Sequence, residues 1–98
     1  MYVRIATFEG SPESLDEAIE QVKGDVETNS RPPGLEDAKG MMMLVDRKTG
    51  KSMGIIMFET EEALKRGDEA MNAMSPDSGD TKRSSVEFYE MPVSVFPS

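Results

Sequence analysis

The chain has 98 residues, 37% of them hydrophobic, and 11 basic against 19 acidic side chains give a formal net charge of −8 at pH 7. This length is typical of one domain, residues 1–98, with a modest core. The negative charge disfavours nucleic acid and anionic membrane surfaces as partners, because Lys and Arg supply that affinity. The chain has neither Cys nor His, so disulfides, thiolate metal sites and histidine ligands are excluded, and we expect no metal and no cofactor.

The N-terminus does not follow the order of a targeting segment, in which a basic stretch precedes an apolar one. No apolar run approaches the roughly 18 residues that a membrane span needs. We therefore expect a cytoplasmic protein with no membrane partner.

The N-terminal third has the pattern of a strand followed by an amphipathic helix. The run from Tyr2 to Phe8 is rich in β-branched and aromatic residues, whose side chains would point alternately to the two sides of a strand. Ser11 is a typical N-cap residue, and Pro12 suits the first helical position. The segment 31–34 would end the helix. The apolar side chains of this helix recur at helical spacing, at Leu15, Ala18, Ile19, Val22 and Val26.

The rest of the chain predicts a hairpin, a second helix and a last strand. Strands are expected over 41–45 and 52–58, joined by a Gly-containing loop at 46–50. Thr60 is the expected N-cap of the second helix. We expect a loop at 75–80, then a strand over 86–95 in which Pro92 makes a kink or an edge position. The stripe of the second helix comprises Ala63, Leu64, Gly67, Ala70, Met71 and Met74.

This element order predicts an α+β, ferredoxin-like βαββαβ fold: a four-stranded antiparallel sheet with two helices on one face. The third strand places Met53, Ile55 and Met57 on one side and Ile56 and Phe58 on the other, so both faces are apolar. A bare second face would be a large exposed apolar patch. We expect a homodimer through this sheet face, with an interface of about 1,600 Å². The alternative is that residues 93–96 fold back over it.

Four polar residues are candidates for a binding site: Arg4, Thr7, Asn72 and Tyr89. Arg4 on a central strand must be paired or face a cavity, and a cross-strand pair with Glu87 or Glu90 is the interpretation we favour. The acidic pairs at 61–62 and 68–69 are interpreted as solvated charges on the outer helix face. Convergence of the four polar residues on one cavity would favour a site, and scattered positions would favour a non-catalytic module.

Nine methionines are a high number for 98 residues. They either fill irregular gaps in a small core or line an adaptable pocket for a flat apolar ligand. The predicted candidate pocket comprises Arg4, Thr7, Met43, Met57, Phe58, Asn72 and Tyr89.

Segment 51–58 is similar to the third-strand octapeptide of the RNA-recognition family in its Lys, internal Gly and final Phe. That family stacks bases on aromatic side chains, whereas Met53 and Ile55 occupy the stacking positions here. We therefore expect no nucleic-acid partner.

With the Phe-Glu-Thr-Glu-Glu-Ala-Leu junction at 58–64 and the segments 31–35 and 67–76, the whole chain resembles the dimeric α/β-barrel superfamily, in particular an actinobacterial branch of its antibiotic-biosynthesis-monooxygenase-like group. The resemblance implies a homodimer with a pocket between sheet and helices in each subunit. Its members include cofactor-independent quinone-forming monooxygenases and haem-degrading enzymes.

Those enzymes typically use a Trp at the end of the third strand and a His in the second helix. Phe58 stands at the first position, and Gly67 or Asp68 lies near the second. Because the chain has neither Trp nor His, histidine ligation of haem is excluded. The resemblance implies binding of an apolar or aromatic small molecule, with cofactor-independent oxygenation of an electron-rich phenol as one use of that site. The alternative is a non-catalytic ligand-sensing or protein-interaction module.

Overall fold

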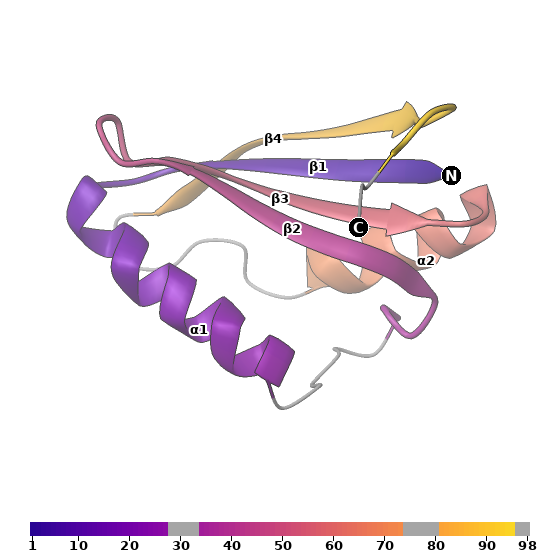
Figure 1. Cartoon of the computed structure of the whole chain (residues 1–98), viewed down its shortest axis with the longest axis horizontal. Coiled ribbons are helices and arrows are strands. Elements are labelled where there is room, and N and C mark those ends of the chain that lie inside the picture. Colours follow the sequence, from indigo (N-terminus) through magenta and orange to yellow (C-terminus); the bar gives the residue numbers. More distant parts are fainter. Residues whose placement is uncertain (28–33, 74–80, 96–98) are drawn as a thin grey trace.

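The computed structural model describes residues 1–27, 34–73 and 81–95. The strands form one four-stranded sheet, and Figure 1 shows the helices on the same side of it. The strand order is β2-β3-β1-β4, and each neighbouring pair is antiparallel. This confirms the predicted ferredoxin-like α+β fold. Within the described ranges, no helix is long and apolar enough to cross a membrane. The elements are β1 (Tyr2–Glu9), α1 (Leu15–Glu27), β2 (Ala38–Asp46), β3 (Lys51–Phe58), α2 (Glu61–Ala73) and β4 (Lys82–Glu90).

Helix α2 packs on the two central strands and forms the core with them. The Thr60 hydroxyl accepts a hydrogen bond from the Ala63 N–H at 3.1 Å, which confirms the predicted N-cap. A Cβ on Gly67 would run into the Phe58 ring, so glycine lets the helix lie close to the sheet. The buried core cluster comprises Leu35, Ile56, Phe58, Ala63 and Leu64.

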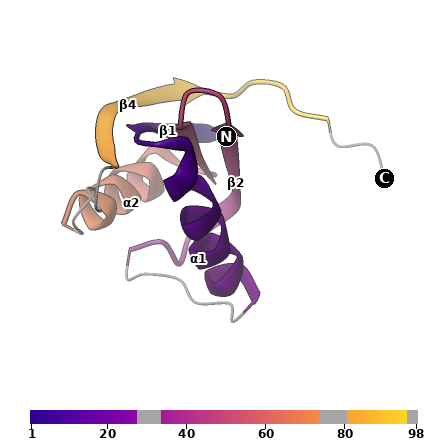
Figure 2. The same ribbon diagram turned by 90° about the vertical axis from the view of Figure 1, so that its left-hand side faces the viewer.

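Helix α1 begins later than predicted, after a 3-10 turn over Pro12–Ser14. The Ser11 side chain makes no capping bond; its carbonyl instead accepts bonds from the Ser14 N–H and hydroxyl, at 3.1 and 2.8 Å. Leu15 is buried, but the rest of the described stripe is only half-buried; the Val26 side chain lies outside the described residues. Figure 2 shows α1 running away from the sheet, which leaves its C-terminal part less covered.

The last strand differs most from the prediction, because β4 spans Lys82–Glu90 and not residues 86–95. The Met91 N–H still donates to the Met1 carbonyl at 2.8 Å, and Pro92 then ends the pairing because it has no N–H. Val93 and Val95 are 76% and 78% exposed, so the described part of the C-terminal segment does not bury itself on the sheet. Phe96 and the expected loop at 75–80 lie outside the described residues.

The strand register separates the sheet into two faces. The side toward the helices, here called the helix side, carries the residues that are level with Arg4 and Ile56, since Arg4 bonds to α2 and Ile56 belongs to the core. Ile56 and Phe58 lie on the helix side, and Met53, Ile55 and Met57 lie on the other side, as predicted. The other side is here called the open face. It carries the polar Thr7, Ser85 and Glu87 beside Val3, Ile5, Met42, Leu44, Met53, Ile55, Met57 and Tyr89.

Candidate functional site

A buried arginine network ties the sheet to α2 on the helix side. Arg4 is 1% exposed, and its Nε donates to Asp68 Oδ1 at 2.9 Å. Its Nη2 donates to Asn72 Oδ1 at 3.4 Å, and the same oxygen accepts from Arg83 Nη1 at 2.7 Å. Residues from β1, α2 and β4 therefore share one polar cluster, here called the Arg4 cluster: Arg4, Asp68, Asn72 and Arg83.

The cluster corrects two sequence interpretations. Arg4 pairs with neither Glu87 nor Glu90. Glu87 is level with Ile5, so its side chain lies on the open face, and the partner comes from the helix above the sheet. Asp68 is also not a solvated outer charge, because its side chain is 24% exposed and faces Arg4.

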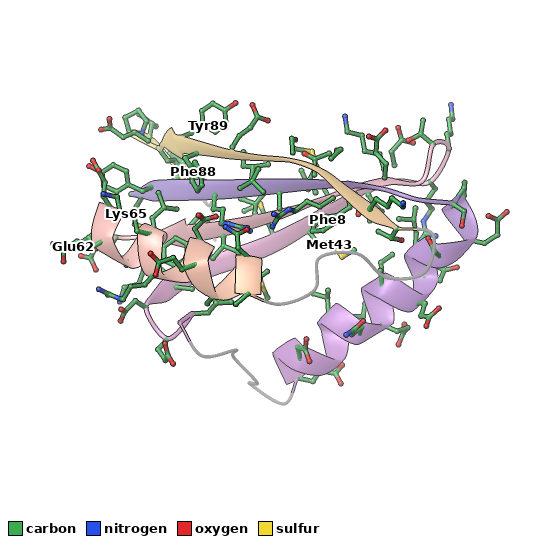
Figure 3. All side chains as sticks on the ribbon, turned by 180° about the vertical axis from the view of Figure 1, so that it is seen from behind. Phe8, Met43, Glu62, Lys65, Phe88 and Tyr89 are labelled. Atoms are coloured by element: carbon green, nitrogen blue, oxygen red, sulfur yellow. The ribbon has the colours of Figure 1, made fainter. Side chains whose placement is uncertain are left out.

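Next to this cluster, the helix side presents partly covered apolar side chains. Phe8 and Met43 are half-buried, and Met41 is 50% exposed. Figure 3 shows Phe8 and Met43 below the sheet, on the side of both helices. Aromatic rings and flexible thioethers make favourable contacts with flat apolar ligands. This surface together with the Arg4 cluster is called the helix-side site below.

The seven predicted pocket residues do not converge on one place. Arg4, Met43, Phe58 and Asn72 lie on the helix side, but Phe58 is 0% exposed and belongs to the core under α2. The other three lie on the open face: Thr7, Met57 and Tyr89.

The predicted pocket also lacked four residues of the helix-side site, namely Phe8, Met41, Asp68 and Arg83. The helical spacing of Asp68 could have indicated its inward position. It lies four residues after the buried Leu64 and three before the half-buried Met71, which places it on the inner face of α2.

A hollow of about 280 Å³ lies at the β4 edge beside the first turn of α2, apart from the helix-side site. Figure 3 shows Phe88 and Tyr89 at this end of the sheet. The Tyr89 hydroxyl donates to Glu87 Oε2 at 2.7 Å, and this bond, with the nearby carboxylate charge, raises the pKa of Tyr89 above its usual value of 10.0. The phenol therefore stays protonated and engaged by Glu87. The hollow is lined by Tyr2, Glu61, Leu64, Phe88, Tyr89 and Glu90.

Solved structures of similar fold cover nearly the whole chain. MhuD, the haem degrader from Mycobacterium tuberculosis, in complex with two haems in its active site, matches with a TM-score of 0.68 and 16% identity over 97% of this chain and 99% of its own. A point mutant of MhuD with two manganese protoporphyrin IX bound per active site gives 0.69 and 15% over 99% and 100%. No protein-family model and no curated protein matches the sequence.

A putative antibiotic biosynthesis monooxygenase from Deinococcus radiodurans matches with a TM-score of 0.62 and 10% identity, over 100% of this chain and 99% of its own. The chain has the ferredoxin-like fold that these solved structures share. At these identities the likeness concerns the course of the backbone, so the site must be interpreted from this chain's own side chains.

The donor groups of this chain do not fit a haem iron. Haem iron in proteins is held by His, Cys or Tyr, or by Met together with His. The chain has no His and no Cys. Neither of its two tyrosines belongs to the helix-side site, because Tyr2 lines the hollow at the β4 edge and Tyr89 lies on the open face, bonded to Glu87. Among the described residues, no group of three or more His, Cys, Asp and Glu side chains could hold a metal ion. We derive no chemistry through haem.

Proposed function

We propose that this protein binds an apolar or aromatic small molecule at the helix-side site and works as a homodimer through its open face. The observation that carries the binding proposal is the position of Phe8, Met41 and Met43. These apolar side chains stay partly uncovered beside the Arg4 cluster, on the side of the sheet that faces the helices. Apolar walls with a few fixed polar groups are typical of small-molecule sites.

The Arg4 cluster gives this site a fixed polar wall. Arg4 and Asn72 are held by bonds that join β1, α2 and β4, so their positions do not depend on a ligand. A rigid wall lowers the entropic cost of binding, because little has to be ordered when the ligand enters. The role of the cluster in this proposal is positioning.

The reaction that this site would serve is oxygenation of the bound molecule. Support comes from the fold that the chain shares with a putative antibiotic biosynthesis monooxygenase. Electron-rich phenols reduce O₂ themselves, so the protein would supply orientation. For 1-naphthol, O₂ takes four electrons: one oxygen atom forms the new carbonyl of 1,4-naphthoquinone, and the other leaves as water.

The homodimer is supported by exposed apolar side chains on the open face of the sheet. Leu44, on the open face, is 48% exposed, and its neighbours on that face include the apolar Met42, Met53 and Ile55. No described helix lies on that face (Figures 1 and 2). An apolar face of this kind is stable in water only when it is covered, and a second copy supplies a matching apolar surface.

A matched pair of variants tests the dimer. Leu44→Lys and Met41→Lys place the same charge on the same strand at nearly equal exposure, 48% and 50%, but on opposite faces. Leu44→Lys should shift the native mass to that of one chain, and Met41→Lys should leave two chains. A wild-type mass of one chain at micromolar concentration would contradict the dimer.

Native mass spectrometry and 1-naphthol binding test the function. We expect the purified protein to retain a small molecule or to bind 1-naphthol, with quenching or enhancement of naphthol fluorescence under nitrogen, and to consume O₂ when air is admitted. Binding without O₂ consumption would support a non-catalytic ligand-sensing module and reject the monooxygenase reaction. Absence of any binding would reject the proposed site.

A further inference from the structure

Most glycines in the described ranges have a visible reason to be glycine. Some adopt a positive φ, and at others a Cβ would run into a neighbouring atom. These are Gly10, Gly34, Gly40, Gly50 and Gly67. Gly24 and Gly54 differ, since a Cβ there would meet no described atom within 4 Å and φ is not positive. Gly24 lies on the exposed surface of α1, so the position that needs an explanation is Gly54.

Gly54 lies in the middle of β3, a central strand, where glycine is a poor choice. It pairs regularly with Ala6 on β1 and Met43 on β2, and the register shifts of the sheet lie elsewhere. Neither a bulge nor a strained backbone therefore requires it. Glycine in a strand interior weakens the strand and otherwise marks a place where a ligand or another backbone comes close.

The position of Gly54 favours a ligand. It is level with Met43, so it faces the helices and belongs to the helix-side site. Its neighbour across the sheet, Ala6, carries a single methyl group and is buried. Gly54 itself is half-buried, so the space above it is in contact with solvent. Ala6 is only 2% exposed, so other atoms already cover it, and the accessible floor is the backbone of Gly54 itself, with Met43 at one edge and Phe8 further along β1.

We propose that a planar aromatic ligand lies against the backbone of Gly54, and that this glycine limits the site to flat molecules. The proposal deepens the function proposed above and rests on it. A flat ring can touch the peptide groups on either side of Gly54, at about 3.5–4.0 Å between carbon atoms. Its edge then meets the Met43 thioether and the Phe8 ring. A rounded aliphatic molecule would touch the same floor over a small area.

The test adds side chains at Gly54 and at its control, Gly24. Gly54→Ala and Gly54→Val build into the proposed ligand space, whereas Gly24→Ala makes the same chemical change on exposed α1. We expect Gly54→Val to weaken 1-naphthol binding at least tenfold, Gly54→Ala to weaken it less, and Gly24→Ala to leave it unchanged. Free Gly54→Val should melt no earlier than wild type, because β-branched residues favour strands, so its loss of binding would not come from unfolding.

A second measurement works on the wild-type protein and covers the case in which a variant fails to fold. In ¹H–¹⁵N spectra, 1-naphthol should shift the Gly54 amide signal through its ring current and leave the Gly24 signal in place. Cyclooctanol, a rounded alcohol, should compete poorly with 1-naphthol. Equal binding by wild type and Gly54→Val, or an unshifted Gly54 signal during binding, would overturn the role of Gly54 while leaving the proposed function intact. No binding to wild type would overturn both.

Discussion

The sharpest stability prediction concerns the Arg4–Asp68 pair, because its two members differ in burial. Arg4 is 1% exposed, and the Asp68 side chain is 24% exposed. Removing Asp68 leaves a buried guanidinium without its carboxylate, and breaking a buried pair in this way costs about 3–5 kcal/mol. Since Asp68 is partly hydrated, we expect Asp68→Ala to cost about 3 kcal/mol, near the lower end of that range.

Removing Arg4 should cost less than removing Asp68. Arg4→Met keeps much of the buried aliphatic stem, and the carboxylate that remains can be reached by water. We expect about 1 kcal/mol, comparable to the loss of an ordinary hydrogen bond. In the double variant Arg4→Met/Asp68→Ala no buried charge is left alone, so it should be more stable than Asp68→Ala by itself.

Thermal and urea unfolding of the four proteins measures this ordering. For a chain of this size 1 kcal/mol corresponds to roughly 4–8 °C in Tm, so Asp68→Ala should melt roughly 12–24 °C below wild type. All four must be compared at one chain concentration, because dissociation of a dimer contributes to the apparent stability. If Arg4→Met were the least stable single variant, or if the two losses simply added, the buried-charge reasoning would be wrong.

Three smaller predictions follow from single contacts. Thr60→Ala removes the N-cap bond of α2 and should cost about 1 kcal/mol in urea unfolding, whereas Thr60→Ser should cost little. Gly67→Ala forces a Cβ against the Phe58 ring and should cost about 1–3 kcal/mol by the same measurement; an unchanged midpoint would show that the ring can move. The bond from Tyr89 to Glu87 raises the pKa of the Tyr89 phenol. This bond is intact below the usual phenol pKa and is lost as pH rises through the higher folded value. Glu87→Gln should therefore shift the appearance of the Tyr89 phenolate absorbance to lower pH.

The sequence predicted those parts of the fold that depend on local signals. Thr60 caps α2 because a hydroxyl just before a helix needs only its own neighbours to bond the backbone. The alternation in 51–58 assigned Ile56 and Phe58 to one face correctly, since strand side chains alternate whatever the partner. The end of β4 was placed too late, because a run of apolar residues after Pro92 resembles a strand although the pairing has already ended.

The candidate site was harder to predict, because it depends on which residues from distant segments share a face. Arg4 and Thr7 are an odd number of positions apart on one strand, so strand geometry alone separates them. Tyr89 was placed with them although it is level with Val3, on the open face. The helical count treats Asp68 and Glu69 as one outward pair, but Asp68 lies four residues after the buried Leu64 and faces inward. In the last case the need of the buried Arg4 for a partner outweighed the usual preference of carboxylates for water.

The backbone likeness and the side chains of this protein lead to different conclusions about chemistry. The fold is that of proteins that include a haem degrader and a putative monooxygenase, yet this chain offers no His or Cys to hold an iron. Arg4 donates to both Asp68 and Asn72, so the three residues act as a wall. A site built from a rigid polar wall, soft apolar side chains and a glycine floor is suited to hold and orient a flat molecule. Any oxidation that occurs there would then be set by the reactivity of the bound molecule, which is why oxygen consumption should follow the oxidation potential of the substrate across a series of naphthols.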